Sequence, residues 1–124
     1  MLKEIYKTKD SSFIIELSEQ DASVDLIFIG KSKDRSPSEF INPVLMKAYD
    51  TAKTVPKEIV LNFYRMSFMN SSTVAPIIKL WSMLKNESIP LRVVFNADLS
   101  WQKTSFAPLA VFHEESDLFT LESR

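Results

Sequence analysis

The sequence contains no cysteine, one histidine and one glycine. The absence of cysteine excludes disulfides, thiol catalysis and cysteine-based metal sites, and it permits a reducing compartment. The single histidine, His113, excludes a histidine-rich metal site. The single glycine, Gly30, excludes the glycine-rich loops that bind phosphates in P-loop and dinucleotide-binding proteins. We therefore expect neither a bound metal nor a cofactor.

The sequence also lacks a strong charge of one sign and a long apolar run. Its 15 Lys and Arg residues balance 16 Asp and Glu residues, for a formal net charge of -1. A nucleic-acid-binding surface needs clustered basic residues, so no nucleic-acid partner is expected. No apolar run approaches the roughly 20 residues that span a bilayer, and Met1–Lys7 lacks the apolar core of a signal peptide. We expect a cytoplasmic protein without a membrane partner.

Length and patterning predict one α/β domain over residues 1–124, with a core from about residue 13 to residue 121. Apolar runs and turn residues predict five strands, the first two as an antiparallel hairpin: 13–17, 24–30, 58–64, 91–95 and 118–121. The continuous apolar strands suggest a sheet that is covered on both faces. We expect a mixed sheet of about five strands, starting with the N-terminal hairpin and packed against helices.

Three helices are predicted between these strands. The first begins at a capping box, Ser36–Glu39, or one turn later at Asn42 and Pro43, and it ends near Thr54. The second begins near Thr73, because a proline such as Pro76 is tolerated only in a first turn. The third is a shorter helix over residues 96–107 that ends before a proline at position 108.

The most informative segment is Phe68–Thr73, which contains three consecutive hydroxyl residues. It follows an apolar strand and precedes apolar residues at helical spacing: Val74, Ile77, Ile78, Trp81 and Leu84. The spacing therefore places Ser71, Ser72 and Thr73 at a helix N-terminus, beside free backbone N–H groups and the positive end of the helix dipole. An anionic group added at this position would be stabilised, and a docked partner would be affected by it.

From about residue 13 to residue 121 the sequence resembles, in the order of its predicted elements, the STAS domain, the fold of bacterial anti-sigma factor antagonists. Ile59–Ser72 resembles that family's buried strand and phosphorylation motif, and Ile77–Leu84 resembles the helix that follows. The resemblance implies a non-enzymatic switch. A histidine-kinase-like serine kinase of the anti-sigma factor type would bind and phosphorylate the domain, and a PP2C-type phosphatase would remove the phosphate. A related subgroup regulates diguanylate cyclases, which makes such a cyclase an alternative partner.

The resemblance allows two registers for the phosphorylated residue. The common antagonist motif is Asp-Ser-Ser-Gly, and matching it makes Ser72 the acceptor, although Asn70 and Thr73 occupy the outer positions here. The motif of the cyclase-regulating subgroup is Asn-Thr-Ser-Ser, and matching it makes Ser71 the acceptor. By resemblance, Asn70 positions the hydroxyl for the kinase. From its residue type alone, it hydrogen-bonds the local backbone or adopts a left-handed turn conformation.

Basic residues follow the second strand at Lys31, Lys33 and Arg35. In the predicted topology their loop lies at the same end of the sheet as the hydroxyl residues. There they steer a partner or neutralise a phosphate, or they form an ordinary solvated loop. We expect the partner-binding face to comprise these residues together with the segment 70–73.

Two other interpretations compete with the switch. In the first, the serines only cap the helix, and the domain is a constitutive protein-interaction or small-ligand-binding module. In the second, His113 and an acidic residue activate Ser72 in a serine hydrolase, although no glycine-containing nucleophile elbow surrounds that serine.

Overall fold

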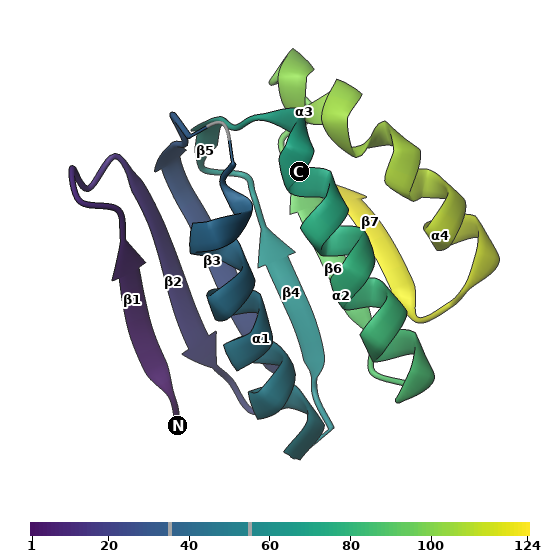
Figure 1. Cartoon of the computed structure of the whole chain (residues 1–124). Coiled ribbons are helices and arrows are strands. Elements are labelled where there is room, and N and C mark those ends of the chain that lie inside the picture. Colours follow the sequence, from purple (N-terminus) through teal and green to yellow (C-terminus); the bar gives the residue numbers. More distant parts are fainter. Residues whose placement is uncertain (35, 55) are drawn as a thin grey trace.

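The computed structural model describes residues 1–34, 36–54 and 56–124, and it describes the backbone but not the side chain of Ser71. The described residues form a mixed sheet of seven strands, with α1 (Ser38–Thr54) and α2 (Val74–Asn86) lying across one face (Figure 1). This architecture confirms the predicted single-domain α/β fold with an N-terminal antiparallel hairpin.

The sheet has the strand order β1-β2-β3-β4-β6-β7, and β5 also pairs with β3. The strands are β1 (Lys3–Lys7), β2 (Phe13–Glu19), β3 (Ser23–Lys31), β4 (Glu58–Asn62), β5 (Met66–Phe68), β6 (Leu91–Phe95) and β7 (Phe119–Ser123). The first three pair antiparallel and the remaining pairs are parallel. Two strands were not predicted. β1 is a mostly charged edge strand without an apolar run, and β5 is too short to show a period.

The first predicted helix begins at the earlier of its two proposed starts. The backbone N–H of Ile41 donates to the carbonyl oxygen of Pro37 at 3.0 Å, and Pro43 lies inside α1. The second helix begins where it was predicted, because the 3₁₀ turn η1 (Ser71–Thr73) leads directly into α2. Pro76 lies in the first turn of α2, where its missing N–H has no helical acceptor.

The short helix predicted over residues 96–107 is confirmed in part: it is α3 (Ser100–Phe106), which begins four residues later than predicted. The 3₁₀ turn η2 (Ala107–Leu109) and α4 (Ala110–Glu115), which follow it, were not predicted. Asn96 starts a turn, because its side-chain Oδ1 accepts the N–H of Asp98 at 2.9 Å. α3 ends at Phe106, before Pro108 as predicted, and Pro108 then lies at the start of η2.

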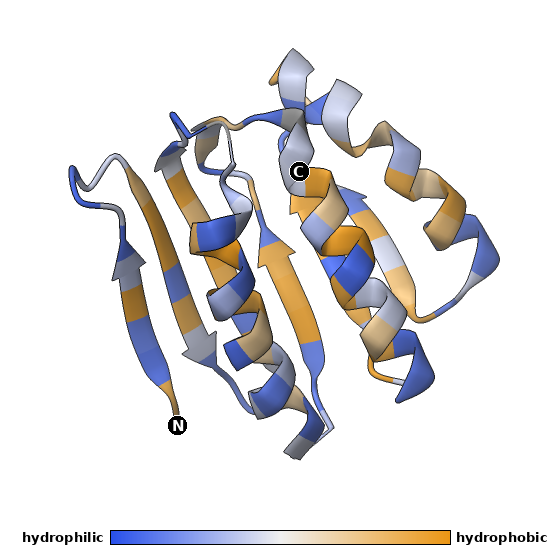
Figure 2. Cartoon of the chain, in the orientation of Figure 1, coloured by the Kyte–Doolittle hydropathy of each residue, from blue (hydrophilic) through white to orange (hydrophobic). Residues whose placement is uncertain are grey.

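The expectation that both faces of the sheet are covered is also wrong. In β4, Ile59 and Leu61 are fully buried, whereas Val60 between them is only half-buried. The strand register places the buried side chains of neighbouring strands on the same face, and this face and the helices form one core cluster. In Figure 2, β4 is orange along most of its length, although the burial of its residues alternates. The domain therefore has two layers, a sheet and a layer of helices.

Across the described residues, every helix is too short or too polar to span a membrane.

Candidate functional site

The segment that carries the hydroxyl residues is fixed to the end of β3. Gly30 pairs with Met66 and Lys31 pairs with Phe68 in the parallel β3–β5 register. The backbone N–H of Ser32 continues this pairing and donates to the carbonyl oxygen of Phe68 at 3.0 Å. The loop after β3 and the start of α2 therefore lie at the same end of the sheet, as the sequence predicted (Figure 1).

Asn70 caps the 3₁₀ turn η1, which leads into α2. Its side-chain Oδ1 accepts the backbone N–H of Ser72 at 3.1 Å, and its carbonyl oxygen accepts the N–H of Thr73 at 3.1 Å. These are the bonds that an N-cap residue makes with the first helical N–H groups. The predicted role of Asn70 in bonding the local backbone is confirmed, and a left-handed conformation is not observed at this residue.

The hydroxyl residues of the segment differ in their access to solvent. Ser72 is exposed, and among the described residues no hydrogen bond involves its Oγ. Thr73 is only 1% exposed, and its Oγ1 has no hydrogen-bond partner among the described atoms. The side chain of Ser71 lies outside the described residues. Of the two hydroxyl groups that the structure describes, only that of Ser72 is accessible to a kinase or a partner.

Two exposed aromatic residues flank the hydroxyl segment. Phe68 is 46% exposed and Tyr64 is 41% exposed, although both belong to the segment that leads to η1. One side of the Phe68 ring packs against Trp101 with the ring centroids 5.8 Å apart. Exposed aromatic side chains are enriched in the cores of protein–protein interfaces. The segment from Tyr64 to Ser72 thus combines partly exposed aromatic groups with an accessible hydroxyl.

Gln102, a residue that was not predicted from the sequence, holds this segment in place. This side chain is fully buried in α3, and its Nε2 donates to the carbonyl oxygens of Phe63 at 2.6 Å and of Met66 at 2.8 Å. Its Oε1 accepts the backbone N–H of Asn96 at 2.8 Å. These three bonds join α3, the link between β4 and β5, and the end of β6. In the sequence Gln102 is only a polar residue shortly before Phe106, and no motif around it indicates this role.

Gly30 is required by the close approach of two chain segments. Its φ is +95°, and a Cβ at this position would lie 2.1 Å from the carbonyl oxygen of Ser12. The same carbonyl accepts the backbone N–H of Lys31 at 2.8 Å. The single glycine of the chain therefore lets the β1–β2 turn contact the end of β3, beside the loop that carries the predicted basic residues.

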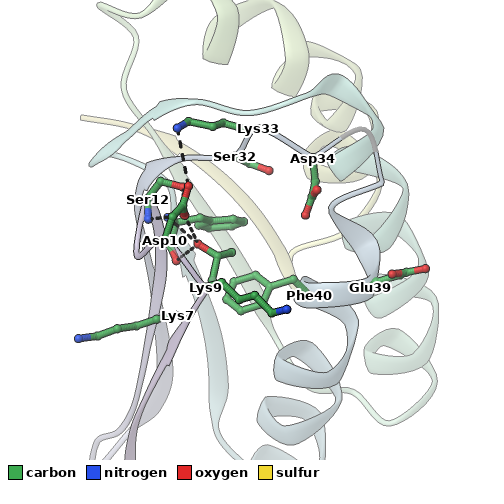
Figure 3. Close-up of a pocket in the computed structure, with 11 residues that line it drawn as sticks. Lys7, Lys9, Asp10, Ser12, Ser32, Lys33, Asp34, Glu39 and Phe40 are labelled. Atoms are coloured by element: carbon green, nitrogen blue, oxygen red, sulfur yellow. Dashed lines mark hydrogen bonds and ion pairs between the residues drawn. The ribbon is translucent and has the colours of Figure 1, made fainter.

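The β1–β2 turn and the loop after β3 border an open cleft of about 600 Å³ (Figure 3). Lys33 lies on this cleft, and its Nζ is 3.7 Å from Oδ2 of Asp10. Hydrogen bonds from Ser12 and from Thr8 lower the pKa of Asp10 to about 2. Lys33 therefore has a local counterion in the β1–β2 turn.

Of the other two predicted basic residues, the structure describes Lys31 but not Arg35. Lys31 is exposed at the end of β3, in register with Phe68. Arg35 lies outside the described residues. Lys31 is thus the basic residue whose position beside β5 the structure establishes.

His113 has a structural contact at the edge of the sheet. Its Nδ1 accepts the backbone N–H of Leu121 in β7 at 3.1 Å. In the sheet order, β4 and β6 separate β7 from β3, with which the β5 segment is paired. The arrangement that the hydrolase interpretation requires, a histidine hydrogen-bonded to Ser72, is not among the contacts of the described residues.

No family model matches the chain, and no curated protein matches it.

Proposed function

We propose that this protein is a non-enzymatic, STAS-like signalling switch, in which phosphorylation of Ser72 or Ser71 controls the binding of a protein partner. The observation that carries the proposal is the position of Ser72. Its free hydroxyl is exposed at a helix N-terminus that Asn70 already caps. The serine side chain is therefore not needed to satisfy the helix, and it remains available for modification.

The surroundings of Ser72 also fit a docking surface. The exposed rings of Phe68 and Tyr64 supply apolar contact area, and Lys31 supplies a positive charge beside β5. Gln102 fixes the backbone from which these groups project. A rigid surface loses little conformational entropy when a partner binds, which favours affinity.

The chemistry of the switch follows from charge. A phosphate adds about -1.5 to -2 charges at neutral pH. At a helix N-terminus such an anion gains about 0.3–1 kcal/mol, so the modified domain remains folded. The same charge pressed against a desolvated or acidic partner surface is strongly unfavourable. Phosphorylation should therefore release the partner without melting the domain.

By analogy with the STAS family, the partner is a serine kinase of the anti-sigma factor type, and a PP2C-type phosphatase reverses the modification. A diguanylate cyclase is the alternative output. The proposal depends on element order and on the geometry around Ser72, since the comparisons assign no family. In this scheme all catalysis belongs to the partners, and this chain needs neither cofactor nor metal.

The test is site-resolved phosphopeptide mass spectrometry on the protein purified from its native host, together with Ser71→Ala and Ser72→Ala variants. Ser82→Ala is the matched control, because Ser82 is also exposed on α2 but donates its hydroxyl to the carbonyl oxygen of Ile78. We expect one phosphate that disappears in only one of the first two variants. The phosphorylated protein should melt at the same temperature or higher, and it should no longer bind the kinase.

No phosphate under any growth condition would contradict the switch and support a constitutive interaction module. A phosphate that leaves kinase binding unchanged would contradict the role of charge in release.

A further inference from the structure

A second apolar feature lies along α2, about two turns beyond Ser72. A groove of about 70 Å³ separates α1 from α2 and is lined by Leu45, Met46, Pro76, Lys79, Leu80 and Met83. Cofactors and drug-sized ligands occupy sites of roughly 300–1,000 Å³. The groove is therefore too small for such a molecule, and its size suits a single aliphatic side chain.

The groove combines apolar walls with a positive edge. Met46 is 40% exposed, and the neighbouring Ile78 on α2 is 37% exposed. Lys79 is exposed and takes part in none of the ion pairs found among the described residues. Over its 13 residues, α2 contains two lysines and no acidic residue. A binding segment with acidic side chains beside an apolar one would be complementary to this surface.

Methionine side chains suit such a groove, because they are flexible and polarisable and can adapt to different apolar partners. Met46 and Met83 contribute from α1 and α2 respectively, so both walls of the groove can adjust. The groove also lies close in the chain to the proposed switch. Ser72 is in the turn η1, which leads directly into α2, and Pro76 and Lys79 of α2 line the groove.

We propose that the groove between α1 and α2 binds the apolar side chain of an acidic amphipathic helix in the protein partner, with Lys79 pairing with an acidic residue of that helix. This inference rests on the proposed function for the identity of the partner. It also supplies a reason for release, because a phosphate on Ser72 would lie about 10 Å along the helix from Lys79, at a rise of about 1.5 Å per residue. That separation is close to the Debye length of about 8 Å at physiological salt.

The chain offers an internal probe for this groove. It has five methionines, of which two line the groove, two are buried elsewhere (Met66 and Met69), and one is the exposed Met1. Each methyl group gives one signal in the NMR spectrum of protein labelled with ¹³C-methyl methionine. The ligands to be added are two synthetic amphipathic helical peptides with the same leucine face. One has glutamates on its polar face and the other has lysines.

We expect the glutamate peptide to shift the signals of Met46 and Met83 and to leave those of Met66 and Met1 in place. Lys79→Glu should weaken this binding about fivefold, because an exposed ion pair contributes up to about 1 kcal/mol. Lys103→Glu is the matched control, since Lys103 is an exposed lysine on α3, and it should leave the affinity unchanged. Equal or tighter binding of the lysine peptide, or no shift at Met46 and Met83 with either peptide, would overturn the proposal.

A Ser72→Glu variant separates this proposal from the proposed function. We expect about a twofold loss of affinity for the glutamate peptide at low salt, and no loss at high salt, where the charge is screened. If the peptide binds in the groove and Ser72→Glu does not change its affinity, the proposed binding site is supported and its regulation by Ser72 is contradicted. If Ser72 is phosphorylated in the cell but neither peptide binds in the groove, the phosphorylation switch is supported and the groove proposal is contradicted. Self-association of the chain through this groove would also contradict an external partner.

Discussion

The side-chain Nε2 of Gln102 lies 2.6 Å from the carbonyl oxygen of Phe63, a residue 39 positions earlier in the chain. The same nitrogen donates to Met66 at 2.8 Å, so one buried amide holds both ends of the short link between β4 and β5. The segment with Phe68 and Ser72 continues from this link. The position of the candidate site therefore depends on a residue in a different element.

We predict that Gln102→Leu lowers the free energy of unfolding by about 1–3 kcal/mol, because the backbone N–H of Asn96 loses its acceptor and the carbonyl oxygens of Phe63 and Met66 each lose a donor. Urea denaturation followed by circular dichroism measures this change. The control is Gln20→Leu, which removes an exposed glutamine and should alter stability by less than about 0.5 kcal/mol. Equal stability of the two variants would show that the Gln102 hydrogen bonds are not important for folding.

Asn70 and Ser72 should contribute differently to stability. Asn70→Ala removes the cap and should cost about 1 kcal/mol, whereas Asn70→Asp retains an acceptor and most of the stability. Ser72→Ala should change stability by less than about 0.5 kcal/mol, since its hydroxyl bonds no described group. Thermal unfolding of the three variants tests this ranking. A larger loss of stability for Ser72→Ala than for Asn70→Ala would indicate that the serine, and not Asn70, caps this turn.

Gly30→Ala should be strongly destabilising. The backbone at this position has a φ of +95°, and the added Cβ would meet the carbonyl oxygen of Ser12. Backbone strain of this kind costs about 1–3 kcal/mol, and the clash adds to it, so we expect a loss of more than about 2 kcal/mol. Denaturant unfolding measures the loss, and amide exchange should show faster opening at the β1–β2 turn. A neutral substitution would mean that the two segments separate easily.

Ser88→Gly should have the opposite effect. Ser88 follows α2 with a φ of 57°, and its N–H donates to the carbonyl oxygen of Lys85 at 3.3 Å. The N–H of Ile89 donates to Leu84 at 3.0 Å, which completes a left-handed helix C-terminus. Glycine adopts this conformation without strain, so we expect a gain of about 0.5–1 kcal/mol in thermal unfolding experiments. A loss of stability would indicate that the serine side chain has a role of its own.

The stability of the β1–β2 turn should depend on acid pH. Hydrogen bonds from the Ser12 hydroxyl and backbone, and from Thr8, lower the pKa of Asp10 from its ordinary value of 3.8 to about 2. Because the folded pKa is lower than the unfolded one, this stabilisation is present above about pH 4 and is lost as the pH falls towards 2. The melting temperature of Asp10→Asn should therefore vary less than that of the unchanged protein over this range. An NMR titration of the Asp10 carboxyl that gives a pKa near 4 would contradict this prediction.

The sequence by itself determined the main elements and the position of the hydroxyl segment. Apolar runs and turn residues indicated β2 and β3, and Pro76 fixed the start of α2, because a proline has few allowed positions in a helix. These signals act between neighbours in the chain. The element order that followed from them was sufficient to predict a mixed α/β sheet with an N-terminal hairpin.

Only the tertiary structure decided how the site is arranged. Thr73 is buried and Ser72 is exposed although both are hydroxyl residues in the same turn, and their difference depends on which elements pack against that turn. The role of Gln102 likewise depends on carbonyl groups more than 30 positions away. The uncovered face of the sheet also depends on tertiary contacts, because the apolar character of a strand does not determine which of its faces the helices will cover. Burial and long-range hydrogen bonds arise from contacts between distant segments, and local sequence patterns do not encode them.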